Sequence, residues 1–161
     1  MALEVEFKFL VADAGWQRDA DAGVPMRQGY LANRDRLSIR VRIAGDQAWL
    51  NVKHAESLTV RHEYEYAIPL ADAEALLATA CTGPLVEKTR YRVPYAQHVW
   101  EVDVFHADND GLVLAEIELD APDESFERPA WLGQDVSNDA RYLNQNLAQH
   151  PYRGWASEAP A

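Results

Sequence analysis

The side chains that could do chemistry in this chain are charged, and they recur in pairs spaced two residues apart. The first group is Glu4, Glu6 and Lys8, which alternate with apolar residues near the N-terminus. Neighbouring side chains of a strand point to opposite faces, so the pattern predicts a strand with one charged face and one apolar face. A single group of this kind is more typical of an edge strand whose charged face meets water.

The same spacing recurs farther along the chain, and the groups are sorted by the sign of their charge. The basic members are Arg40, Arg42, Lys53, Lys88 and Arg90, and the acidic members are Glu63, Glu65, Glu101, Asp103, Glu116 and Glu118. A solvated outer face would interleave the two signs, because opposite charges stabilise each other across strands and like charges repel. The sorting therefore requires another reason.

Two arrangements of these strands are open. If the apolar faces pack inside a barrel, the charges lie on its outer surface. If helices cover the apolar faces from outside, the charges point into an interior about the size of one small ligand. A dry interior could not hold them, because desolvating each ion costs several kcal/mol. A water-filled tunnel that binds a charged ligand could, and we favour this arrangement over the solvated outer face.

The rest of the pattern predicts about eight strands joined mostly by short connections. They cover residues 4–9, 26–33, 37–43, 47–55, 58–70, 85–94, 97–106 and 112–120. The expected fold class is α+β and mainly antiparallel β, an eight-stranded closed tunnel barrel with a charged interior and a few flanking helices.

Few helices are expected. Residues 71–80 are rich in alanine and leucine and end before Gly83-Pro84, which predicts a helix, and a C-terminal helix is predicted at 138–150. A short helix or loop is predicted at 13–23, and a short helix followed by a loop is predicted at 122–131. Residues 1–150 are expected to form one domain, followed by a disordered tail at 151–161.

The charges constrain the ligand. The eight acidic and six basic members leave an excess of two negative charges. Six basic side chains suit a chain of phosphates, since the arginine fork matches phosphate oxygens. A polyphosphate anion would not enter a negative lining unaided, and divalent cations held by the carboxylates resolve this. Oxygen ligands favour Mg²⁺ or Mn²⁺, whereas the five scattered histidines and the lone cysteine do not suggest a soft-metal site.

Composition excludes several classes of function. The net charge of −11 and the lack of a basic run argue against a nucleic acid partner. The chain has no apolar run long enough to span a membrane, and its N-terminus lacks the layout of a signal peptide. Cys81, the only cysteine, excludes an internal disulfide and suits a reducing compartment, so we expect a cytoplasmic protein.

The order of these charged groups resembles that of the CYTH superfamily, the triphosphate tunnel metalloenzymes, over residues 3–147. The matching groups are Glu4-x-Glu6-x-Lys8, Arg40-x-Arg42, Lys53, Glu63-x-Glu65, the 86–91 segment VEKTRY, Glu101-x-Asp103 and Glu116-x-Glu118. The resemblance is strongest to short, single-domain bacterial members, which also share features with the segments 27–31 and 139–142.

The resemblance implies a metal-dependent triphosphatase that hydrolyses inorganic triphosphate, or a related organic triphosphate, to pyrophosphate and phosphate. By the same resemblance, Glu4, Glu6, Glu116 and Glu118 hold the metal. Substrate is held by Lys8, Arg40, Arg42, Lys53, Lys88 and Arg90. Glu101 and Asp103 are further ligands or orient the attacking water, so that the expected catalytic set is Glu4, Glu6, Lys8, Glu101 and Asp103. Glu63 and Glu65 are expected to orient the basic residues.

Several alternatives stay open at this point. The family also includes class IV adenylyl cyclases and thiamine triphosphatases, and a non-catalytic polyphosphate-binding module would show the same sequence. Tyr30 and Arg141 either border the tunnel mouth or pack in an ordinary way. Relatives often carry lysines on the C-terminal helix, where this chain has Ala140, Leu143 and Gln145. A monomer and a homodimer are equally compatible with the sequence.

Overall fold

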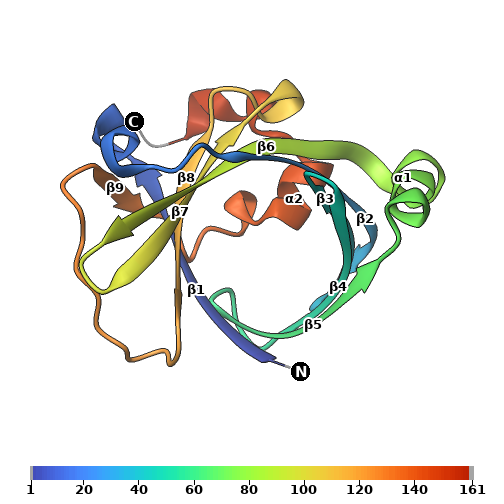
Figure 1. Cartoon of the computed structure of the whole chain (residues 1–161), viewed down its shortest axis with the longest axis horizontal. Helices are drawn as coiled ribbons and strands as arrows, with labels where there is room; N and C mark the ends of the chain where they lie inside the picture. The colour runs from blue at the N-terminus through green and yellow to red at the C-terminus, as the bar shows by residue number, and fades with distance from the viewer. Residues whose placement is uncertain (1, 160–161) are drawn as a thin grey trace.

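The computed structural model describes residues 2–159. Eight antiparallel strands of this chain form a closed ring (Figure 1). The strands are β1 (Ala2–Val11), β2 (Val24–Arg34), β3 (Leu37–Ala44), β4 (Gln47–Ala55), β5 (Val60–Ile68), β6 (Thr82–Tyr95), β7 (His98–Phe105) and β8 (Val113–Leu119). Their order is β5-β4-β3-β2-β6-β7-β8-β1, and pairing of β1 with β5 closes the ring. The predicted fold class and all eight predicted strands are confirmed.

The first strand closes the ring because it pairs with β5 along one edge and with β8 along the other. Residues 2–5 of β1 pair with β5, whereas β8 pairs with residues 5–10 along the other edge. Beyond β5, a short ninth strand, β9 (Leu132–Asp135), pairs with residues 9–11 of β1. The sequence analysis missed β9, because four residues that include a glycine carry no clear alternation.

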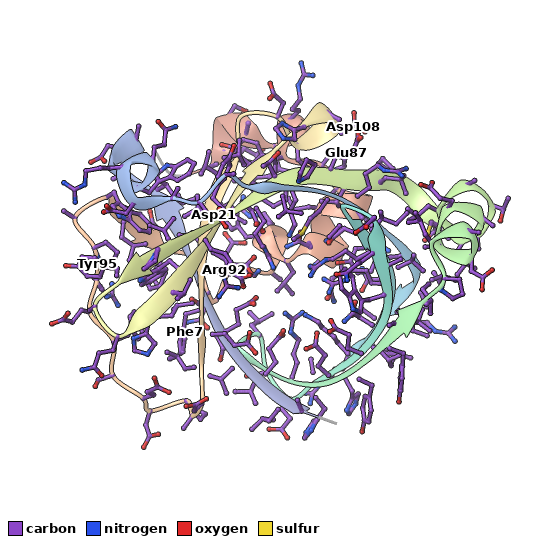
Figure 2. All side chains as sticks on the ribbon, viewed as in Figure 1. Phe7, Asp21, Glu87, Arg92, Tyr95 and Asp108 are labelled. Atoms are coloured by element: carbon purple, nitrogen blue, oxygen red, sulfur yellow. The ribbon has the colours of Figure 1, made fainter. Side chains whose placement is uncertain are left out.

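Apolar residues cover the ring from outside, as the tunnel arrangement requires. On β1, Val5 and Phe9 are buried in an outer cluster with Trp100 and Trp131. Figure 2 shows Phe7 on the outer side of β1, and its ring lies 6.1 Å from that of Phe126. The short helix predicted within 122–131 is wrong, because the segment that carries Phe126 runs as a loop, and its aromatic side chains provide the cover instead.

Helix α1 (Leu70–Thr79) covers another part of the outer surface (Figure 1). Its buried Ala73 and Leu77 pack on Val41, Ile43 and Ala48 of β3 and β4. This confirms the helix predicted at 71–80. The segment predicted at 13–23 as a short helix or loop contains a 3-10 helix, Ala14–Asp19, whose N-terminus is capped by Asp13.

The inward face of the ring changes from charged to apolar along several strands. Leu10 on β1, Val86 on β6, Phe105 on β7 and Leu114 on β8 continue the alternation of the charged residues but belong to an apolar cluster. The C-terminal segment fills this end of the ring with Tyr142, Leu147 and Ala148. Helix α2 (Asn144–Gln149) accordingly lies within the ring in Figure 1.

The C-terminal helix is shorter than predicted. A 3-10 turn, Ala140–Tyr142, precedes α2, and the backbone of Leu143 between them is extended, with ψ 134°. An extended residue cannot continue the helical hydrogen-bond pattern, so one helix over 138–150 is not formed. No helix among residues 2–159 has the length and apolar character needed to cross a lipid bilayer.

The structure also departs from the expectation of a disordered tail after residue 150. Two 3-10 turns follow, Tyr152–Gly154 and Ala156–Glu158, and Trp155 is 9% exposed. Its ring packs edge-on against Tyr142 and Tyr152, and its indole N–H donates to the carbonyl of His150 at 2.9 Å. The tail is ordered because this tryptophan extends the core around α2. Residues 160–161 of the predicted tail lie outside the described residues.

Replacement of Trp155 tests this part of the core. Trp155→Ala should lower the free energy of unfolding by about 3 kcal/mol, because a large buried aromatic side chain is removed. Chemical denaturation followed by tryptophan fluorescence or circular dichroism measures the change. Arg153→Ala in the preceding turn is the control, and an equally small effect of both substitutions would show that the tail does not stabilise the fold.

Candidate active site

A cavity of about 240 Å³ lies inside the ring and is lined mainly by charged side chains. Figure 2 shows side chains projecting from the strands into this space. Of the residues proposed from sequence as catalytic, metal-binding or substrate-binding, the structure brings ten to the lining: Glu4, Glu6, Lys8, Arg40, Arg42, Lys53, Arg90, Glu101, Glu116 and Glu118. Glu63, Glu65 and Tyr30 line it as well.

The register of the strands sets the neighbours on the acidic wall. Glu6 lies opposite Glu118, and Lys8 lies opposite Glu116, in the antiparallel pair of β1 and β8. Glu101 of β7 lies opposite Glu116 from the other side. Because side chains at paired positions share a face, the ladder gathers four carboxylates around one lysine.

Some of these carboxylates are neutralised within the protein. Lys8 Nζ lies 2.8 Å from Glu116 and 3.1 Å from Glu6. Glu4 is held by Lys53 at 3.0 Å and by Arg61 at 2.8 Å. Burial alone would raise the pKa of Glu4, but the charges of Lys53 and Arg61 outweigh it and lower that pKa to about 2.

Other carboxylates lack sufficient positive charge. Desolvation, together with the negative charges of Glu4 and Glu6, raises the pKa of Glu118 to about 7, although Glu118 remains accessible to solvent. Burial and the charges of Glu116 and Glu4 also raise the pKa of Glu6, despite its contact with Lys8. Both shifts mean that this wall would be stabilised by an added cation.

The basic wall has the opposite imbalance. Within residues 2–159, neither Arg40 nor Arg42 forms an ion pair with a carboxylate. Arg42 Nε donates to Gln28 Oε1 at 2.9 Å, and Arg40 Nε is buried without a partner in this part of the chain. Burial, with the positive charges of Arg40 and Arg90, lowers the pKa of Arg42 to about 9. An anion in the cavity would relieve this repulsion.

These two walls face each other across the ring. Strand β3, which carries Arg40 and Arg42, lies four strands from β8 in either direction around the ring. The cavity is therefore polarised, with unpaired guanidinium groups on one side and crowded carboxylates on the other. A ligand that combines phosphate groups with a divalent cation matches this arrangement.

Two of the residues proposed from sequence stand behind the lining. The side chains of Lys88 and Asp103 have no exposed surface, and Lys88 Nζ lies 2.7 Å from Asp103. The other oxygen of Asp103 accepts from Arg90 Nε at 2.7 Å. In this geometry Asp103 orients Arg90, and Lys88 neutralises Asp103, so neither side chain faces the cavity.

The structure also resolves the residues whose roles were open. Arg141 lies outside the cavity lining, where it pairs with Asp139 at 2.6 Å and stacks on Trp155. Glu63 lies 3.5 Å from Lys53, and Glu65 accepts from Asn51 Nδ2 at 2.7 Å. The placement of Glu63 agrees with a role in orienting Lys53, which stays a prediction.

Several lining residues were not selected from sequence. Arg61 continues the alternation of Glu63 and Glu65 and could have been found from that spacing, as could Asn51 beside Lys53. Asn144 and Gln145 come from α2, and no strand pattern indicates that this distant segment reaches the cavity. A second pocket, of about 480 Å³, shares Gln145 and Arg61 with the cavity and extends beside α2.

Comparison with known proteins places this geometry in a family. A model of the CYTH domain matches residues 2–152. An inorganic triphosphatase of Acetivibrio thermocellus is 43% identical over 157 residues, which cover 96% of this chain and 99% of that protein. An inorganic triphosphatase of Nitrosomonas europaea is 38% identical over 151 residues, which cover 90% of this chain and 96% of that protein.

Solved structures show the same fold. The crystal structure of the inorganic triphosphatase NE1496 has a TM-score of 0.66 and 36% sequence identity, and the match covers 92% of this chain and 95% of that one. A putative adenylyl cyclase from Hippeastrum, described as having a dominant triphosphatase activity, shares the fold with a TM-score of 0.59 at 13% identity. The match covers 74% of this chain and 80% of that one. The ordered charged groups, the closed ring and these relatives agree, and the chain belongs to the CYTH domain family.

Proposed function

We propose that this protein hydrolyses inorganic triphosphate to pyrophosphate and orthophosphate inside the charged cavity, with the help of a divalent cation. The observation that carries the proposal is the polarised lining, in which Arg40 and Arg42 have no carboxylate partner within the described residues and face the crowded acidic wall. The two relatives at 43% and 38% identity, both named inorganic triphosphatases, support it.

Substrate binding would fall to the basic side chains of the lining. Arg40 and Arg42 present guanidinium groups that match phosphate oxygens, and Arg90 is held toward the cavity by Asp103 and Glu101. Burial, with the charges of Arg61 and Arg40, lowers the pKa of Lys53 to about 8 even though Glu4 contacts it. A phosphate anion would favour the charged form of Lys53 and so stabilise the complex.

The acidic wall fits a divalent cation in its donor atoms. Among residues 2–159, no three side chains of His, Cys, Asp or Glu form a ready-made ligand set. We therefore propose that Glu4 and Glu6 of β1, with Glu116 and Glu118 of β8, provide some of the ligands and that phosphate oxygens and water supply the rest. Mg²⁺ is commonly bound in this way, and Mn²⁺ takes similar oxygen ligands. When bound, such a cation neutralises phosphate charge and lowers the pKa of a coordinated water.

The chemical step is attack of a water molecule on the terminal phosphorus, with cleavage of one phosphoanhydride bond and departure of pyrophosphate. Positive side chains around the phosphates stabilise the transition state, as in other phosphoryl transfers. Among residues 2–159, the Glu101 carboxylate accepts a hydrogen bond only from Arg90, at 3.2 Å, so one of its oxygens is available to orient water. We propose Glu101 for this role, with Lys8 fixing the neighbouring carboxylates.

The lining favours inorganic triphosphate over substrates with an organic group. A cyclase must hold adenine and ribose, and a thiamine triphosphatase must hold aromatic rings. Of the described residues, Tyr30 is the only aromatic one that lines the cavity, and the rest are charged or polar. A cytoplasmic location, suggested by the single Cys81, remains part of the proposal, and so does either a monomeric or a homodimeric state.

A panel of substrates tests the activity. Inorganic triphosphate should be cleaved to pyrophosphate and phosphate much faster than ATP or thiamine triphosphate, with Mg²⁺ or Mn²⁺, and chromatography identifies the products. Cyclic AMP from ATP, with inert inorganic triphosphate, would instead support a cyclase.

Replacement of Arg42 tests the basic wall. Arg42→Ala should lower kcat/KM for inorganic triphosphate on the order of tenfold or more, because a charged hydrogen-bond donor to phosphate is lost. Arg141→Ala, which removes an arginine outside the cavity, is the matched control.

Thermal unfolding tests whether the anion and the cation bind together. Triphosphate and Mg²⁺ together should raise the melting midpoint by more than the sum of their separate effects, because each neutralises charge that opposes the other. Differential scanning fluorimetry with each ligand alone and with both measures the effect. Additive shifts would contradict the coupling of the two walls.

The raised pKa of Glu118 predicts a pH dependence in the metal-free protein. Between its ordinary value of 4.5 and about 7, Glu118 binds more protons in the folded than in the unfolded state. The contribution of Glu118 to the free energy of unfolding therefore decreases as pH rises through that window. In the presence of EDTA, Glu118→Gln should be increasingly more stable than the wild type between about pH 5 and about pH 8. A difference in melting midpoint that does not change with pH would remove Glu118 from the crowded group.

A further inference from the structure

Two buried amide side chains connect helix α2 to the walls of the cavity. Gln28 of β2 has no exposed surface, and Asn144, the first residue of α2, is 9% exposed. Gln28 Nε2 donates to Asn144 Oδ1 at 3.0 Å, and Lys88 Nζ donates to the same oxygen at 3.0 Å. On its other side, Gln28 accepts from Arg42 Nε at 2.9 Å.

The orientation of both amides follows from the contact of Gln28 with Arg42. A guanidinium can only donate hydrogen bonds, so the atom of Gln28 beside Arg42 must be its oxygen. The nitrogen of Gln28 then points to Asn144, whose facing atom must be an acceptor. The contact of Lys88 Nζ with the same Asn144 atom agrees with this assignment, because the charged form of lysine only donates.

One consequence is that the Asn144 amide nitrogen is directed away from both contacts. Asn144 lines the cavity, and across residues 2–159 its Nδ2 has no hydrogen-bond acceptor. Two N–H donors are therefore available at the end of the cavity that α2 fills. Nothing in the strand pattern assigns this residue to the site.

We propose that Asn144 Nδ2 donates a hydrogen bond to a terminal phosphoryl oxygen of the bound triphosphate, so that α2 forms part of the anion site as well as filling one end of the ring. This inference rests on the function proposed above. It also assigns a positioning role to Gln28, which holds both Arg42 and Asn144.

A neutral donor suits this position better than a further cation. Lys88 contacts Asn144 directly, and the repulsion among Arg40, Arg42 and Arg90 already lowers the pKa of Arg42. A lysine in place of Asn144 would add to that repulsion when substrate is absent. An amide contributes N–H donors to the phosphate without this cost in the free protein.

The alternative is that Asn144 only ties α2 to the barrel, and Asn144→Asp separates the two roles. Aspartate keeps an oxygen that accepts from Gln28 and Lys88, but it replaces the free amide nitrogen with a second carboxylate oxygen. A purely structural role is therefore preserved by this substitution, whereas a role as donor is lost. Asn144→Ser, which is neutral and too short to reach the same point, gives the comparison without added charge.

Binding is measured by calorimetry with the full chain, Mg²⁺ and a methylene-bridged triphosphate analogue that cannot be hydrolysed. We expect Asn144→Asp to weaken binding on the order of tenfold or more and Asn144→Ser by a smaller factor, because a hydrogen bond to a charged oxygen is removed. The melting midpoint of the free Asp variant should stay close to that of the wild type. Gln145→Glu places the same charge on the neighbouring lining residue and should weaken binding less than Asn144→Asp.

The outcomes distinguish this inference from the proposed function. If the wild type binds the analogue and cleaves triphosphate, but both Asn144 variants bind within about twofold of it, the role of Asn144 is refuted alone. Equal losses in Asn144→Asp and Gln145→Glu, with none in Asn144→Ser, would show a general charge effect and also refute it. A wild type that neither binds the analogue nor cleaves triphosphate would overturn both proposals.

Discussion

Electrostatic repulsion between like charges inside a closed ring is the constraint on which the rest of this structure depends. Burial and neighbouring carboxylates raise the pKa values of Glu6 on β1 and Glu118 on β8, while burial with the charges of Arg40 and Arg90 lowers that of Arg42. Internal ion pairs such as Lys8 with Glu116 relieve only part of the repulsion. Charges of this kind persist in a protein interior only when water and ligands share their solvation.

This constraint reverses the usual placement of apolar residues in a small barrel. Because the interior is charged, the core must form on the outside, where α1, the 122–131 loop and the 3-10 helix at Ala14–Asp19 supply cover. The exception is the end filled by α2, where Val86, Phe105 and Leu114 turn the inner face apolar. The apolar end fixes how far the charged cavity extends and places Asn144 beside it.

The period-two alternation was sufficient to predict the eight strands, because each inward charge is separated from the next by one outward apolar residue. It also predicted most of the lining, since residues in one alternation share a face. It could not show that Lys88 and Asp103 are covered, because depth depends on which neighbouring side chains stand in front of them. Strand β9 and the cavity contacts of Asn144 were missed because both arise from segments without an alternating pattern.

The distribution of unsatisfied groups argues for a ligand that carries both signs of charge. An anion alone would satisfy Arg40 and Arg42 but would leave Glu6 and Glu118 more strongly repelled, and a cation alone would do the reverse. A phosphate chain with a coordinated divalent cation brings the two charges in a fixed geometry. The closed ring separates the basic wall on β3 from the acidic wall on β8 by four strands in each direction. The scaffold that crowds like charges on each wall therefore also holds the two halves of the site in place for such a ligand.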